Sequence, residues 1–238
     1  YVDAAISGRL DYTTTATDTV MAQVNAATQL NLTVRADEFG QAGDIRLSFS
    51  NSLVTPNLRA YGPEPAGLGG DLWFSAFDNR LADTAPGTYG RLALLQQVGA
   101  ALGLQAPGIN GLAVPADEDQ LRYSMMSLRP FAGANPANGY TNAVFPSTLM
   151  INDIAALQAL YGADAGGETA GADEYQLQQE PIFQTLWDSG GVDRLVPVNQ
   201  SQGVALYLTP GRWSSVGTAY FDGQAQVRNT LTIAYGTV

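Results

Sequence analysis

The clearest chemical pattern in the sequence is RLALLQQVGAALGLQAPG, residues 91–108. It has the spacing of a zinc-binding helix followed by a glycine turn, His-Glu-x-x-His-x-x-Gly-x-x-His, in which three histidines hold the metal and the glutamate activates water. In this frame the ligand positions are Gln96, Ala100 and Ala106, and the glutamate position is Gln97. None of these side chains is a strong zinc ligand or a carboxylate base. The pattern therefore predicts the helix and the turn without zinc.

The composition restricts the remaining chemistry. The 238 residues include no Cys and no His, which excludes disulfides, thiol catalysis and histidine general bases. Acidic residues number 22 against 11 basic ones, all arginine, and the formal charge of -11 argues against a nucleic-acid partner. An acidic, cysteine-free exported protein often gains rigidity from bound calcium. No apolar run approaches the roughly 20 residues that cross a bilayer.

The spacing of apolar residues along the chain predicts the helices and strands that position the motif residues. Apolar residues at helical spacing predict helices at 16–28, 88–104 and 149–162. Alternating apolar and polar residues predict strands at 30–37, 44–51 and 70–77, with an edge strand near the prolines of LRAYGPEP. GADAGGETAGADE is expected to be a linker, followed by short strands at 182–188, 192–198, 203–209 and 229–236. The predicted fold class is α+β, with one domain at residues 1–162 and a linker and small all-β region at residues 163–238.

Several motifs in a fixed order give the chain a family resemblance. They are GDLWFS before the central helix, GTYGRLALLQQ leading into it, YSMMSL after it, LMINDIAALQALYGAD, and IFQTLWDSGGVD. With these motifs the chain resembles the serralysin family of secreted metzincin proteases over most of residues 44–238. The resemblance implies a metzincin-like domain with a mixed twisted sheet, in which Met126 is the methionine of the conserved turn. A tyrosine near the zinc would stand where this chain has Leu128. It also implies secretion from a bacterium by a type I route and an RTX-type calcium β-roll after the last residues.

The same resemblance implies a calcium site in WDSGGVD, at the junction of the two regions. The ligands it implies are Asp188, Gly190 and Asp193, with the backbone carbonyls of Ala170, Ala172 and Glu174 from the preceding loop. Carboxylate and carbonyl oxygens suit calcium, which takes 6–8 of them. The alternative is a Gly-Gly turn that the aspartates merely cap.

These observations favour a pseudoprotease: a metzincin-like domain that is not an enzyme, because every zinc ligand and the catalytic glutamate are replaced. Such a domain would serve as a binding or structural module of a secreted calcium-dependent protein. A protein or peptide would occupy the former substrate cleft, against the edge strand near Leu58–Tyr61. The alternatives are a structural segment of a large surface protein or adhesin, and a hydrolase that uses a serine nucleophile or a carboxylate pair. For Gln96, Gln97 and Ala100, the plain alternative is ordinary helix packing with no ancestry in metal binding.

Overall fold

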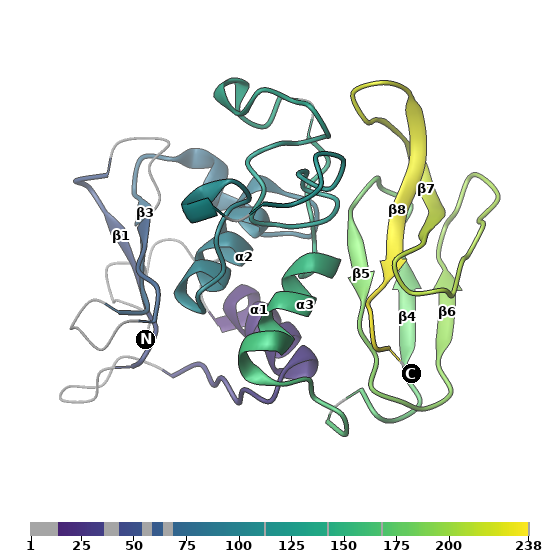
Figure 1. The fold of residues 1–238 in the computed structure, drawn as a ribbon, viewed down its shortest axis with the longest axis horizontal. Coiled ribbons are helices and arrows are strands. Elements are labelled where there is room, and N and C mark those ends of the chain that lie inside the picture. The colour runs from purple at the N-terminus through teal and green to yellow at the C-terminus, as the bar shows by residue number, and fades with distance from the viewer. Residues whose placement is uncertain are drawn as a thin grey trace.

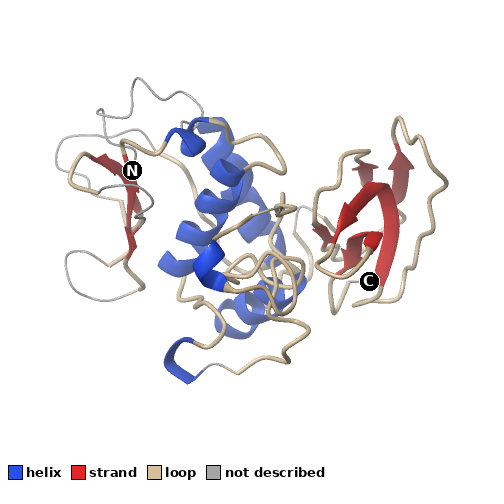
Figure 2. Cartoon of the chain, turned by 90° about the horizontal axis from the view of Figure 1, so that it is seen from above, coloured by secondary structure: helices blue, strands red, loops and turns tan. Residues whose placement is uncertain are grey.

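The structure, a computed structural model, describes residues 14–35, 43–53, 59–63, 69–111, 113–141, 143–167 and 169–237. Within these ranges three α-helices lie at the centre, between a small sheet on one side and the strands of the C-terminal region on the other (Figure 1). The view from above shows the same order, strands, helices, strands (Figure 2). This mixed arrangement is compatible with the predicted α+β class. None of the described helices is long and apolar enough to cross a membrane.

All three predicted helices are present, as α1 (Thr14–Ala27), α2 (Tyr89–Ala101) and α3 (Ile151–Tyr161). The Thr88 side chain accepts a hydrogen bond from the backbone N–H of Arg91, which caps the start of α2. Gly103 has φ +94°, a left-handed conformation that stops α2 and redirects the chain. The helix and glycine turn predicted from residues 91–108 are therefore confirmed.

The first sheet has the order β1-β3-β2, with β1 at Arg46–Ser50, β2 at Arg59–Ala60 and β3 at Asp71–Ser75. Strand β1 runs parallel to β3, and β2 pairs with β3 antiparallel at the edge, as predicted for LRAYGPEP. The other residues predicted for that edge, Leu58 and Glu64–Pro65, lie outside the described residues. Arg46 and Asp71 join β1 to β3 through two hydrogen bonds of 2.6 and 2.7 Å.

The strand predicted at 30–37 is wrong over residues 30–35, and residues 36–37 lie outside the described part. The Asn25 side chain of α1 accepts a hydrogen bond from the Leu32 N–H (2.7 Å) and donates one to the Leu32 carbonyl (2.8 Å). Because α1 satisfies both backbone groups of Leu32, the segment lies along the helix instead of joining a sheet.

The C-terminal region contains two small sheets. Strands β4 (Glu174–Leu177) and β6 (Arg194–Pro197) form a parallel pair. The other sheet has the order β5-β8-β7, with β5 at Gln184–Leu186, β7 at Trp213–Phe221 and β8 at Gln226–Ile233. Strands predicted at 182–188, 192–198 and 229–236 are present as β5, β6 and β8. The strand predicted at 203–209 is reduced to a single bridge between Ala205 and Ser215, and β4 and β7 were not predicted.

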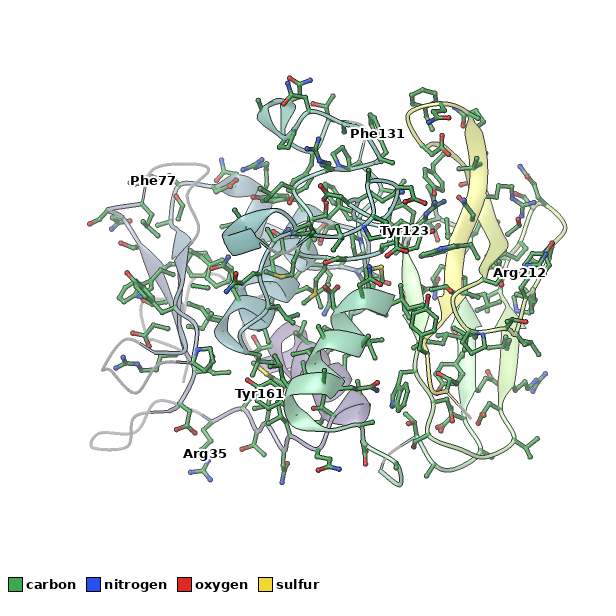
Figure 3. All side chains as sticks on the ribbon, in the orientation of Figure 1. Arg35, Phe77, Tyr123, Phe131, Tyr161 and Arg212 are labelled. Carbon is green, nitrogen blue, oxygen red and sulfur yellow. The ribbon has the colours of Figure 1, made fainter. Side chains whose placement is uncertain are left out.

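One hydrophobic core joins the helices to the first sheet and reaches into the C-terminal strands. It is built from Leu and Val side chains of α1, α2 and β3 and includes Phe183, Tyr220 and Ala234. Tyr123, labelled in Figure 3 beside the C-terminal strands, contacts Trp213 of β7 with ring centroids 5.4 Å apart. A second, smaller cluster around Leu177, Val216 and Leu231 fills the C-terminal region itself.

Candidate functional site

Helix α2 carries Gln96, Gln97 and Ala100 of the motif and packs against the methionine turn. An ideal Cβ at Gly99 would be 2.5 Å from Met125 Cε and 3.1 Å from Met126 Sδ, so a larger residue there would force these two side chains to shift. Both methionines are buried, at 0% and 8% exposed. Met125 and Met126 therefore pack against α2, and the assignment of Met126 as the turn methionine of the family stays a prediction.

Gln96, at the first ligand position of the motif, ties α2 to this turn by hydrogen bonds. Its Nε2 donates to the Met125 carbonyl (2.7 Å) and to the Tyr140 hydroxyl (2.8 Å), and the Tyr140 hydroxyl donates to the Ser127 carbonyl (3.1 Å). Burial raises the pKa of Tyr140 to about 12, so the phenol stays protonated at neutral pH. Tyr140 lies 44 residues from Gln96, and no local pattern in the sequence indicated the contact.

The other motif positions differ in their surroundings. Gln97 is only 8% exposed, and its buried Oε1 has no hydrogen-bond partner among the described residues. Ala100 and Ala106 are half-buried, and Leu128 is 48% exposed. Hydrogen bonds therefore bring only Gln96 together with the turn.

A buried carboxylate of α3 also binds the methionine turn. Asp153 in the first turn of α3 is 3% exposed and accepts hydrogen bonds from the Ser124 hydroxyl (2.7 Å), the Met125 N–H (2.7 Å) and the Met150 N–H (3.1 Å). Burial raises its pKa to about 6, although all three hydrogen bonds oppose that shift. Asp153 was not among the residues singled out from the sequence.

A group of three carboxylates lies in the C-terminal region. Oxygens of Asp173, Asp188 and Asp193 are all within 4.8 Å of one another. Asp188 is buried and accepts from the Gly190 N–H (2.8 Å) and from the Tyr175 hydroxyl (2.6 Å), while Asp193 accepts from the Asp173 N–H (3.0 Å). Burial, followed by the hydrogen bond to Asp188, raises the pKa of Tyr175, so this hydroxyl remains a donor.

The structure thus brings together two of the predicted ligands, Asp188 and Asp193, and adds Asp173. The loop predicted to supply carbonyls does lie against the turn, because an ideal Cβ at Gly191 would overlap the Gly171 carbonyl and one at Gly190 would be 3.9 Å from the Ala170 carbonyl. The Glu174 carboxylate turns away and pairs with Arg194 at 3.4 Å. The carbonyls of Ala170, Ala172 and Glu174 stay predictions.

These residues fit a calcium ion chemically. Three carboxylates and nearby carbonyls are the oxygen donors that a hard cation prefers. One carboxylate oxygen, Asp173 Oδ2, is buried without a hydrogen-bond partner among the described residues. A bound cation would compensate both that oxygen and the concentrated negative charge.

Comparison with known proteins supports the resemblance. No model of a known protein family matches the chain. It is 29% identical over 201 residues to Serralysin of Proteus mirabilis (75% of this chain, 40% of the relative) and 28% identical over 195 residues to Serralysin C of Dickeya chrysanthemi (73% and 40%). Metalloprotease AprA of Pseudomonas entomophila (strain L48) is 27% identical over 209 residues (76% and 43%). The chain is homologous to these proteins and spans about 40% of their length.

The comparisons correct one prediction. The replaced residues Gln96, Gln97, Ala100 and Ala106 led to the expectation that the chain is not an enzyme, whereas the relatives it matches are named as metalloproteases and serralysins. That expectation is contradicted. The expectation relied on four side chains in one helix and turn. The similarity to the named proteases extends over about three quarters of the chain.

Proposed function

We propose that this chain is the peptide-recognising domain of a serralysin-type protein that acts outside the bacterial cell and is stabilised by calcium. The names of the relatives support peptides as the class of molecule recognised. The observation that carries the proposal is the edge strand β2 beside the motif-bearing helix, which pairs on one side with β3 and on its other side with no strand among the described residues.

The open edge belongs to β2. Both backbone groups of Tyr61 are bonded toward β3, since its N–H donates to the Asp71 carbonyl (3.0 Å) and its carbonyl accepts from the Gly70 N–H (3.0 Å). Successive residues of an antiparallel strand alternate in direction, so the N–H and carbonyl of Ala60 point to the open side. An ideal Cβ at Gly62 would be 3.7 Å from the Ala100 carbonyl, which places this part of the chain next to α2. An extended peptide can add to such an edge as a further strand.

Changing Ala60 to proline is expected to weaken peptide binding about tenfold, the effect of losing one backbone hydrogen bond of about 1 kcal/mol together with its local geometry. Proline is tolerated at strand edges, so the melting temperature should change little. The measurement is fluorescence anisotropy with a panel of labelled, unstructured apolar peptides, followed by mass spectrometry of the same mixtures to detect cleavage.

The matched control is Ala60→Val, which keeps the N–H and should bind as the parent does. Equal binding by the proline variant would contradict recognition at β2. A panel in which no peptide is bound or cleaved would contradict the proposed function as a whole.

We also propose that the carboxylates of Asp188 and Asp193 bind a calcium ion. Calcium would neutralise their charge and tie the turn after β5 to the start of β6. At a calcium concentration 100 times the dissociation constant, binding adds about 2.7 kcal/mol to the free energy of unfolding. For a chain of this length that raises the melting temperature by about 5–10 °C.

The double variant Asp188→Asn, Asp193→Asn should lose this calcium-dependent increase. Thermal unfolding in calcium chloride and in chelator measures it. A wild-type protein that melts at the same temperature in both would rule out the site.

A further inference from the structure

The β7–β8 hairpin contacts the loop that carries the methionine turn (Ser124–Ser127) on both sides of that turn. We propose that this hairpin of the C-terminal region positions the turn, and that Arg122 and Phe131 are the positioning residues through which it acts. The relevance of this positioning to peptide recognition rests on the proposed function, because the turn supports the motif-bearing helix at Gln96.

The contact before the turn is made by Arg122. Its guanidinium carbon lies 5.2 Å from the centroid of the Tyr123 ring and 5.1 Å from that of Trp213, the first residue of β7. The two rings are 5.4 Å apart, and all three side chains are half-buried. A guanidinium on aromatic rings is held more strongly in such a site than on an exposed ring, because less water competes for it. Arg122 therefore attaches the chain just before the turn to the start of β7.

The charge of Arg122 also acts on the far end of β7. Burial raises the pKa of Tyr220 to about 12, and the neighbouring Arg122 guanidinium opposes this shift. At the tip of the hairpin, Asp222 has a pKa below its ordinary value in spite of desolvation, because two backbone N–H groups donate to it and Arg122 is positive. Arg122 thus interacts with the hairpin along its length, from Trp213 to Asp222.

The contact after the turn is made by Phe131. Its ring meets that of Phe221, the last residue of β7, edge to face with centroids 6.5 Å apart. An ideal Cβ at Gly223 would be 2.3 Å from the Phe131 ring, so this ring lies directly on the backbone of the hairpin tip. Figure 3 shows Phe131 beside that tip. The hairpin therefore holds the chain after the turn as well as before it.

The turn between these two contacts reaches helix α2. Its two arms are joined by a hydrogen bond from the Leu121 N–H to the Arg129 carbonyl (2.9 Å), so they move as one unit. Inside that unit the Met125 carbonyl accepts from Gln96 Nε2 (2.7 Å). A loss of either hairpin contact should therefore change how Met125 is held against Gln96, although neither residue contacts the hairpin through a hydrogen bond among the described residues.

The test replaces Arg122 with methionine, which keeps an unbranched apolar stem and removes the guanidinium, and follows the protein by NMR. The Met125 amide should exchange with solvent about tenfold faster, the effect of losing a cation–aromatic contact in a partly desolvated site. Through the Met125 carbonyl, the change should also shift the side-chain NH2 signals of Gln96. Amides of α1 should exchange at the wild-type rate. Phe131→Ala, at the other contact, should produce the same pattern.

Arg212→Met is the matched control. Arg212 also lies over an aromatic ring, 3.9 Å from the centroid of Tyr207, but on the outer side of the C-terminal region (Figure 3). This variant should leave the Met125 amide and the Gln96 signals unchanged.

Two results would overturn the inference. If Met125 exchange and the Gln96 signals stayed as in wild type in both Arg122→Met and Phe131→Ala, the turn would be fixed by Asp153 of α3 without help from the hairpin. If exchange accelerated equally in the turn and in α1, the two residues would contribute to overall stability alone. None of these measurements uses a peptide, so a wild-type protein that binds no peptide would contradict the proposed function and not the positioning of the turn.

Discussion

Replacing Asp153 with alanine is expected to lower the free energy of unfolding by about 4 kcal/mol, because each unsatisfied buried polar group costs about 1–3 kcal/mol and three would be created. The groups are the Ser124 hydroxyl and the N–H groups of Met125 and Met150. The same change detaches the methionine turn from α3. Urea unfolding at pH 7 measures the loss, and the melting temperature should fall by about 10 °C.

Asp153→Asn is the informative control. Its amide oxygen can accept from both N–H groups and its NH2 can donate to Ser124 Oγ, so most of the stability should remain. A loss of less than about 1 kcal/mol in the alanine variant would show that the network does not hold the turn.

The two variants should also differ from wild type in how the free energy of unfolding depends on pH. Burial raises the pKa of Asp153 from its ordinary value to about 6, so between about pH 4 and pH 6 the folded state binds this proton more strongly than the unfolded state does. The contribution to stability is therefore present at low pH and is lost as the pH rises through about 6. Subtracting the Asp153→Asn profile from that of wild type should isolate this slope, and parallel profiles would contradict the shifted pKa.

Replacing Phe183 with alanine is expected to lower the free energy of unfolding by about 4 kcal/mol, which is typical when a fully buried aromatic side chain is removed. Phe183 is 1% exposed, and its ring contacts Tyr220 and Trp213 of β7 with centroids 5.3 and 6.5 Å away. Its backbone bonds to the chain before α3, since its N–H donates to the Phe145 carbonyl and its carbonyl accepts from the Ser147 N–H. The cavity would therefore open where the C-terminal strands meet the helices.

In Phe183→Leu the leucine side chain fills most of the cavity, so the free energy of unfolding should fall by only about 1.5 kcal/mol. Limited proteolysis alongside thermal unfolding distinguishes local from global loss, because a loosened interface exposes the C-terminal strands to cleavage first. Equal stability of the alanine variant and wild type would mean that the two parts of the chain are held together elsewhere.

The helices were predictable from sequence because apolar residues recur at helical spacing within each short segment, although α2 is buried on almost all sides and Leu160 of α3 is exposed. Leu92 and Leu95 on α2 and Leu102 directly after it are all buried, and Gly103 redirects the chain there as its position suggested. Strands β1 and β3 were predictable for the same reason, with alternation in place of helical spacing. Strand β7 was not, because Gly217 with φ +71° and two register irregularities interrupt its alternation.

The family motifs in the sequence singled out Asp188, Asp193 and the methionine turn as candidates, and the helix spacing singled out Gln96, because each lies in a short contiguous pattern. Only the tertiary structure decided that Tyr140 bonds to Gln96, that Asp153 holds the turn, and that Asp173 completes the acidic group. These contacts join residues 20 to 44 positions apart. Asp173 meets Asp193 because the register of β4 and β6 sets Glu174 opposite Arg194, and a strand register depends on packing across the whole sheet rather than on the residues at either position.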